Sequence, residues 1–221
     1  MSSSVLPKEK AKRIVGILVP VGLSALMATF TKALVDKSGN TWLPISTDDI
    51  IENIENVEKY TASSASSIAN IYPVVVNAIS DYFDKHPKTI KFIVFTSDIM
   101  LMNYIGVKPK HLGIFVPSAI MLKDIISNAF DTLAEEVLNK VKASNEVDKF
   151  VDVFAGSGEA QDETVKECIE CKEQISKDLT DMIENRSKFL YTYKQACSEY
   201  SSIDDLKTSI LDRLELREMY A

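Results

Sequence analysis

The alternation of apolar and polar positions predicts a chain built mainly of long amphipathic helices. Apolar residues recur three and four positions apart over 47–86, 118–154, 162–200 and 203–219, which is the spacing of one buried helix face. The region 162–200 keeps this spacing throughout and places Cys168 and Cys197 on the apolar stripe. The pattern therefore favours a mainly α fold in which long amphipathic helices pack as a bundle.

Capping residues precede several of these segments. Thr47 is a candidate N-cap with two acidic residues after it, and Ser118 can begin the next helix. Ser201 or Ser202 can cap the last helix, with an aspartate in the reciprocal position. No proline follows Pro117, which leaves the second half of the chain free for long helices.

Residues 89–117 allow two interpretations. The segment can be helical, or it can hold a short strand over 90–95 and a matching strand over 112–116. The second interpretation adds a small two-stranded β element near 90–116 to the helical fold. Asp98 stands among apolar residues. It can be a buried carboxylate with a raised pKa, or it can be the cap of a helix. We interpret it as a cap.

The segment 13–36 predicts a hydrophobic N-terminal helix. Residues 14–31 carry no charge and would form a helix about 27 Å long, close to the roughly 30 Å of a bilayer core. Four small residues stand four positions apart and would let another helix approach closely: Gly16, Pro20, Ser24 and Ala28. The segment is thus a candidate membrane anchor or a helix buried between subunits.

This interpretation divides the chain into a basic tail (1–12), the hydrophobic helix (13–36) and a helical body (37–221). Basic residues before the helix predict a cytoplasmic N-terminus and an extracytoplasmic body. A glycosylation sequon at Asn185 agrees with that topology, whereas unpaired thiols are unusual in an oxidising compartment.

Composition excludes several classes of protein. Apolar residues make up 46% and charged residues 26%, so the chain is neither disordered nor a polytopic membrane protein. A net charge of −7 disfavours nucleic acid as a partner. Three cysteines do not make a disulfide framework, and the CxxC spacing of Cys168 and Cys171 lies within a helical pattern. We expect no metal, no cofactor and chemically inert cysteines.

No sequence motif indicates catalysis. The chain lacks GxGxxG, GxxxxGK[ST], HExxH and GxSxG, and it has only two histidines. Its adjacent acidic pairs would diverge on a helix, so they do not converge on a substrate. We therefore expect no enzymatic activity.

The sequence favours a non-enzymatic structural or assembly subunit that associates with a membrane through the N-terminal helix and docks partners, or further copies of itself, through long helices. The alternative is a soluble helical shell, scaffold or virion component, in the cytoplasm or within a protein assembly, whose N-terminal helix is buried by neighbouring copies. The candidate helix-packing interface comprises Gly16, Pro20, Ser24, Ala28, Ile175, Met182, Phe189 and Tyr193.

Overall fold

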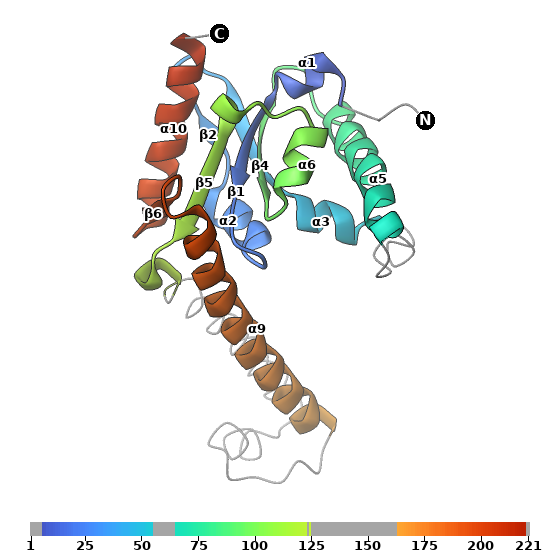
Figure 1. Cartoon of the computed structure of the whole chain (residues 1–221), viewed down its shortest axis with the longest axis vertical. Coiled ribbons are helices and arrows are strands. Elements are labelled where there is room, and N and C mark those ends of the chain that lie inside the picture. Colours follow the sequence, from blue (N-terminus) through green and yellow to red (C-terminus); the bar gives the residue numbers. More distant parts are fainter. Residues whose placement is uncertain (1–5, 55–64, 123, 125–162, 220–221) are drawn as a thin grey trace. The chain divides into compact units, whose positions relative to one another are not determined.

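The computed structural model describes residues 6–54, 65–122, 124 and 163–219 (Figure 1). The chain divides into two compact units, one made of residues 1–118 and 185–221 and the other of residues 119–184. The first unit is an α/β domain. The described residues of the second are helical.

A mixed, curled sheet of six strands forms the centre of the α/β domain, in the order β2-β3-β4-β1-β5-β6. All neighbouring strands run parallel except the edge pair β2–β3, which is antiparallel. The prediction of a mainly α helical bundle is therefore wrong. The strands are β1 (Ile14–Leu18), β2 (Leu34–Val35), β3 (Thr41–Ser46), β4 (Lys91–Thr96), β5 (Leu112–Pro117) and β6 (Ser198–Tyr200).

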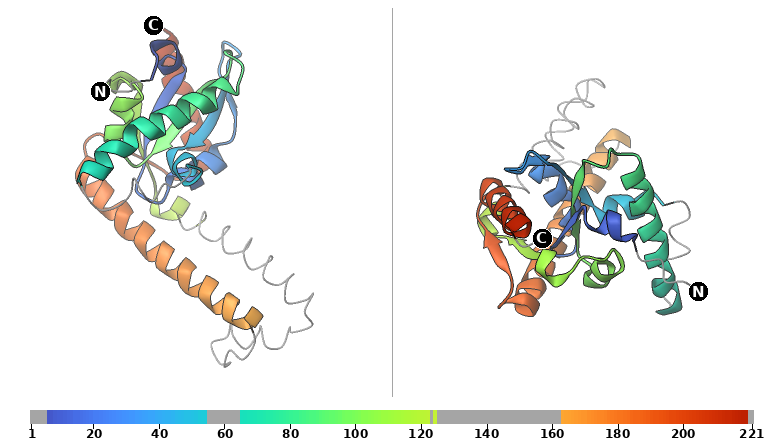
Figure 2. Two further views of the ribbon diagram at one scale, coloured as in Figure 1. Left: turned by 90° about the vertical axis from the view of Figure 1, so that its right-hand side faces the viewer. Right: turned by 90° about the horizontal axis from the view of Figure 1, so that it is seen from above.

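Helices cover both faces of this sheet, so the domain has three layers. The pair α5 and α6 lies against one face, and α2 and α10 lie against the other (Figure 2). The helices are α1 (Lys8–Ala11), α2 (Ser24–Thr31), α3 (Thr47–Glu52), α5 (Ala65–Asp84), α6 (Ile99–Tyr104), η1 (Pro109–His111), α9 (Glu163–Tyr193) and α10 (Ile203–Met219).

The hydrophobic segment 13–36 is not one helix but the unit β1–loop–α2, followed by β2. All five residues of β1 are buried, because the strand lies between β4 and β5 and is covered on both faces. A parallel strand that is buried on both faces has a continuous apolar sequence. Gly16 permits the close approach of α6, since a Cβ there would stand 2.5 Å from the Met102 sulfur. Among the described helices, none combines the length and apolarity needed to cross a bilayer.

The strands expected near 90–116 exist, but their pairing differs from the prediction. The bounds of β4 and β5 lie within one residue of the two predicted strands. Each pairs with β1, which lies between them, so they do not form a separate two-stranded element.

The predicted helices are partly confirmed. The region 162–200 contains α9, which ends at Tyr193, and its last residues form β6 instead. The helix over 47–86 is divided into α3 and α5, and the cap of α3 is Ser46, whose hydroxyl accepts from the Asp48 N–H. Ser202, one of the two predicted caps, caps α10 by accepting from the Asp205 N–H at 3.1 Å. Of the helix predicted over 118–154, all but residues 118–122 and 124 lies outside the described residues.

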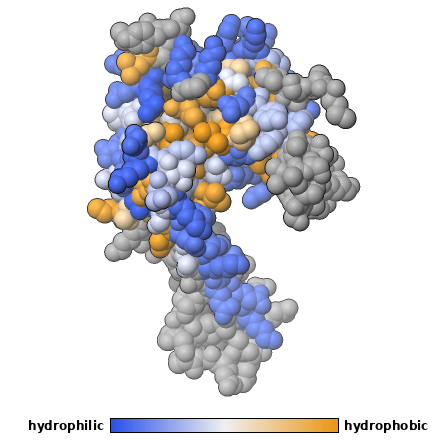
Figure 3. All heavy atoms as spheres, viewed as in Figure 1, coloured by the Kyte–Doolittle hydropathy of each residue, from blue (hydrophilic) through white to orange (hydrophobic). Residues whose placement is uncertain are grey.

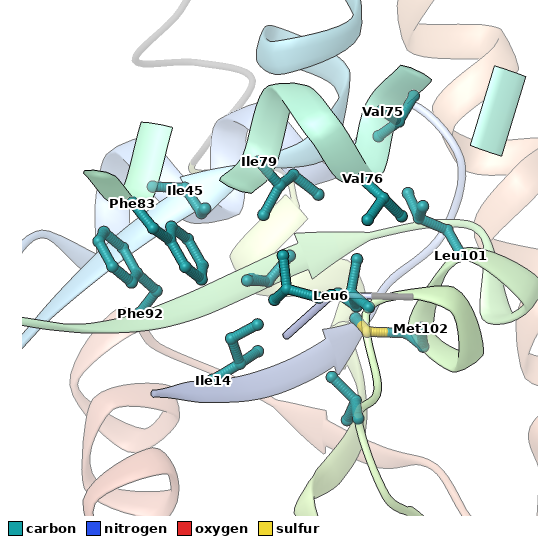
Figure 4. Packing of buried hydrophobic residues seen from close by; sticks show 13 residues of the cluster. Leu6, Ile14, Ile45, Val75, Val76, Ile79, Phe83, Phe92, Leu101 and Met102 are labelled. Atoms are coloured by element: carbon teal, nitrogen blue, oxygen red, sulfur yellow. The ribbon is translucent and has the colours of Figure 1, made fainter. Parts of the chain in front are cut away.

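The main core fills the space between the sheet and the helices α5 and α6 (Figure 4). Phe83 of α5 stacks on Phe92 of β4 with ring centroids 3.9 Å apart. Ile79 and Val76, on the same face of α5, and Ile14 of β1 are also buried. The helical period of α5 therefore does serve a buried face, but that face packs on a sheet.

A second core binds the end of α9 to the sheet. Phe189 packs with Leu18 of β1 and Val116 of β5. Beside it, Arg186 donates to the Pro117 carbonyl at 2.8 Å and to the Glu199 carboxylate at 3.0 Å. The predicted packing of long helices as a bundle is therefore wrong for this end of α9, because its apolar side chains contact strands.

Candidate functional site

The candidate site lies at the carboxyl ends of the parallel strands. The chain leaves β1 toward β3 and leaves the neighbouring β4 toward β5, on the opposite side of β1. Open α/β sheets bind their ligands where the connections of adjacent strands diverge in this way. We call the region formed by the ends of β1, β3 and β4 the switch-point site.

The loop from β1 to α2 forms one wall of this site. The Val19 N–H donates to the Thr96 carbonyl at 2.9 Å, which ties the loop to the end of β4. Gly22 has a φ of 83°, a conformation that glycine adopts without strain. Leu23 and Ser24, at the start of α2, are fully buried.

This strand–loop–helix unit can be compared with the phosphate-binding pattern GxxxxGK[ST]. Over residues 17–24 the second glycine and the hydroxyl residue of the pattern are present as Gly22 and Ser24. The first glycine is replaced by Ile17 and the lysine by Leu23. The unit therefore lacks the side chain that neutralises phosphate charge.

Buried hydroxyl groups fill the switch-point site. The Ser24 hydroxyl donates to the Asp48 carboxylate and accepts from the Ser46 hydroxyl at 3.2 Å. The Thr47 hydroxyl donates to the Thr96 hydroxyl at 2.8 Å. All four hydroxyl residues are at most 1% exposed. The bonds form two neighbouring groups, which we call the hydroxyl network. One joins Ser24 of α2 to the end of β3 and to α3, and the other joins Thr47 of α3 to the end of β4.

Asp98 belongs to a second polar cluster beside this network. Its carboxylate accepts from the N–H groups of Met100 and Leu101, which confirms its predicted role as the cap of α6. It also accepts a 2.8 Å hydrogen bond from the Tyr72 hydroxyl, and Tyr72 stacks on Tyr104 with centroids 4.7 Å apart. Burial, then the hydrogen bond to Asp98, raise the pKa of Tyr72 to about 12. The cluster fixes α5 against α6.

The two described histidines lie away from the switch-point site. His86 contacts Phe92 at the start of β4, and His111 lies just before β5, so both described histidines are at the amino ends of the strands. Ser24 faces a carboxylate rather than an imidazole base. In the described ranges, no group of three or more histidine, cysteine or acidic residues could hold a metal ion.

The structure separates the residues of the predicted interface. Gly16 lies in β1, Pro20 in the following loop, and Ser24 and Ala28 in α2, so these four do not form one helix face. Of the other four, which all lie in α9, Phe189 packs into the sheet and contacts Tyr193. Their contact with a partner stays a prediction.

Two of the cysteines lie in α9, and the third, Cys197, follows it. Burial and the nearby Glu199 raise the pKa of the Cys197 thiol, while Arg186 opposes the shift. A raised pKa lowers the thiolate fraction and hence the reactivity. This agrees with the expectation of an inert cysteine.

Sequence reasoning missed the partners of Ser24. Each of two apolar runs is followed by two hydroxyl residues and an aspartate, as Ser46-Thr47-Asp48 and as Thr96-Ser97-Asp98. Taken as strand ends, these repeated triplets would have placed polar groups at one edge of a parallel sheet. The helical interpretation of 47–86 concealed the first triplet.

The fold defines an α/β protein with a mixed, curled sheet of six strands and helices on both faces. No protein-family model, no curated protein and no solved structure matches the chain.

Proposed function

We propose that the protein is a non-enzymatic binding protein that docks partner proteins within an assembly. One observation carries the proposal: at the switch-point site, where this architecture places its ligand, the hydroxyl groups are buried and hydrogen-bonded to other side chains of the protein. Leu23 occupies the lysine position of the phosphate-binding pattern and is fully buried, and Ser24 is held by Asp48.

Electrostatics also disfavour a phosphate ligand at this site. A phosphate group would lie near the Asp48 carboxylate and would find no lysine at the position where the pattern places one. Like charges at close range repel, and a desolvated anion needs a compensating cation. The hydroxyl network therefore serves better as a structural connection than as a catalytic centre.

Exposed apolar side chains next to the site support the docking role. Val21 follows β1 and is 57% exposed, while Ile99 and Met100 follow β4 and are 38% and 52% exposed. Apolar side chains also gather over the body of the domain in one view, whereas the visible side of α9 is hydrophilic (Figure 3). We propose that these side chains form one contact surface for a partner, since contiguous exposed apolar patches mark contact surfaces between proteins.

Site-specific photo-crosslinking tests the docking role. A photoreactive residue at Met100 should give one reproducible crosslinked species in native extract, and Val21→Asp should abolish it. The control position is Leu216 of α10, which is 54% exposed but lies after β6. Equal crosslinking from both positions, or no effect of Val21→Asp, would contradict the proposal.

A second candidate function is the binding of a magnesium–nucleotide complex. The observation that favours it is the position of Gly22 and Ser24 at the start of α2, with Asp48 hydrogen-bonded to the serine. Isothermal titration with Mg-ATP and Mg-GTP separates the two functions. We expect no saturable heat, and binding at micromolar concentration would favour the second function over the first.

Leu23→Lys sharpens this comparison. Burying a lysine at this fully buried position should destabilise the protein by several kcal/mol. If the loop were a phosphate site, Mg-ATP would restore stability to the variant in proportion to the nucleotide concentration. We expect the thermal midpoint of the variant to be unaffected by nucleotide.

A further inference from the structure

A cavity of about 610 Å³ lies along the free edge of β3 in the α/β domain. The short β2 pairs only with Thr41 and Trp42. Among the described strands, the rest of β3 is therefore paired on one side only, with β4. The cavity follows residues 44–46 of this edge, is bordered by α2, α3 and α5, and is open to solvent.

Part of the cavity wall is apolar, beside the polar side chains of Thr29, Ser46, Asn53 and Tyr82, and the size of the cavity suits a small ligand. Ala28 of α2 and Ile45 of β3 line the apolar part and are buried, and Ile50, Ile54 and Ala78 complete it. Pockets for small molecules in proteins enclose about 300–1,000 Å³ and have mostly apolar linings.

The edge itself disfavours the addition of a peptide strand. Pro44 stands in the lining and has no N–H group to donate to an incoming strand. Proline on an edge strand is one of the features that prevent strand pairing. The cavity therefore suits a compact ligand or a single side chain.

Charged groups line the cavity unequally. Asp49 of α3 and Asp81 of α5 contribute carboxylates, and Lys85 contributes one ammonium group. In the part of the chain that the structure describes, neither carboxylate has a hydrogen-bond or ion-pair partner. Burial, and then the neighbouring Asp48, raise the pKa of Asp49. An added positive charge would stabilise both carboxylates.

We propose that this cavity binds an organic cation, with a short apolar chain on the apolar part of the wall and an ammonium or guanidinium group between Asp49 and Asp81. The bound cation can come from two sources. It is a free alkylamine, or it is a lysine or arginine side chain of a partner protein. The inference is independent of the proposed docking function, because the cavity does not involve the exposed residues after β1 and β4.

Titration of the full ¹⁵N-labelled chain with hexylammonium, hexanol and hexanoate, followed by amide chemical shifts, tests the proposal. Hexylammonium should shift the amides of β3, α3 and α5 saturably at millimolar concentration and bind more tightly than the other two probes. Equal binding of hexanoate, or the absence of saturation, would overturn the proposal.

Charge variants give opposite expected effects. Asp49→Asn and Asp81→Asn should each weaken hexylammonium binding about two- to fivefold, which is the range for partly exposed ion pairs. Lys85→Met should strengthen it, because it removes a like charge. The control is Asp212→Asn on the exposed side of α10, which should change nothing. Unchanged affinity in all three cavity variants would overturn the proposal.

A capped lysine tripeptide distinguishes the sources. Binding tighter than that of hexylammonium indicates a partner's side chain, and weaker binding indicates a free amine. Both results support the cation site.

Discussion

Gly16→Ala tests whether residues 14–18 form a central strand beneath α6. The added Cβ would stand 2.5 Å from the sulfur of Met102, 2.9 Å from its terminal methyl and 3.0 Å from a methyl of Val107. Met102 is 1% exposed and Val107 is 7% exposed, so neither side chain can move into solvent. Overpacking of this kind typically costs about 1–3 kcal/mol.

A small opposing effect reduces this cost. Alanine restricts the unfolded chain more than glycine does, which stabilises the folded state by about 0.4–1 kcal/mol. We therefore expect a net loss of about 0–2.6 kcal/mol in the free energy of unfolding. For a chain of this size, each kcal/mol lowers the melting temperature by about 2–4 °C.

The sign of the effect distinguishes strand from helix. In the middle of a helix, replacing glycine with alanine would stabilise the protein by about 0.5–1 kcal/mol. Urea denaturation followed by circular dichroism measures the difference. A Gly16→Ala variant more stable than the wild type would refute the packing of α6 on β1.

A double-mutant cycle isolates the contact. Met102→Ala alone should cost about 2–5 kcal/mol because it leaves a cavity. The new methyl group at position 16 would occupy part of that cavity, so the double variant should lose less stability than the sum of the two single changes. A coupling of at least about 0.5 kcal/mol is expected for residues in contact. Additive losses would show that the two side chains do not meet.

Three further predictions concern other elements of the domain. Phe189→Ala should cost about 3–5 kcal/mol, whereas Tyr191→Ala, at a side chain 90% exposed, should change thermal stability by less than about 0.5 kcal/mol. Asp36→Asn should weaken the hairpin β2–β3. Burial opposes ionisation of Asp36, but hydrogen bonds from Trp42 (2.7 Å) and Asn40 outweigh the effect of burial and lower the pKa of Asp36. The stability from ionised Asp36 is therefore complete above the unfolded pKa near 3.9 and is lost as pH falls through the lower folded value, so the variant should show a flatter acid unfolding curve. Tyr72→Phe should remove the ionisation near pH 12 from the ultraviolet titration of the tyrosines. It should also lower the free energy of unfolding by about 1 kcal/mol, because one hydrogen bond is lost. A variant that keeps this ionisation would show that another tyrosine carries it.

Local patterns in the sequence determined part of the fold. The four-and-three spacing of apolar residues placed α9, α10 and most of α5 correctly, because a helix buries one face whatever it packs against. The cap at Ser202 and the cap at Asp98 were also predicted, since capping depends on neighbouring residues alone.

The same patterns could not determine β1 or the partners of the strands. A continuous apolar run fits a central parallel strand, a buried helix or a membrane span, and length alone did not separate them for residues 14–31. The pairing of β4 and β5 with β1, rather than with each other, joins residues 78 apart (14 and 92) and 96 apart (16 and 112) in the chain. No local signal encodes such a contact.

The candidate site depended most on tertiary structure. Ser24, Asp48 and Thr96 come from three distant segments, and each alone has an ordinary local explanation as a small helix residue, a first-turn acid or a strand end. The sequence by itself determined the residue types, including the leucine where a phosphate-binding loop has lysine. Only the parallel order of β3, β4 and β1 brought the hydroxyl and carboxylate groups together, because parallel strands present their carboxyl ends at one edge of the sheet.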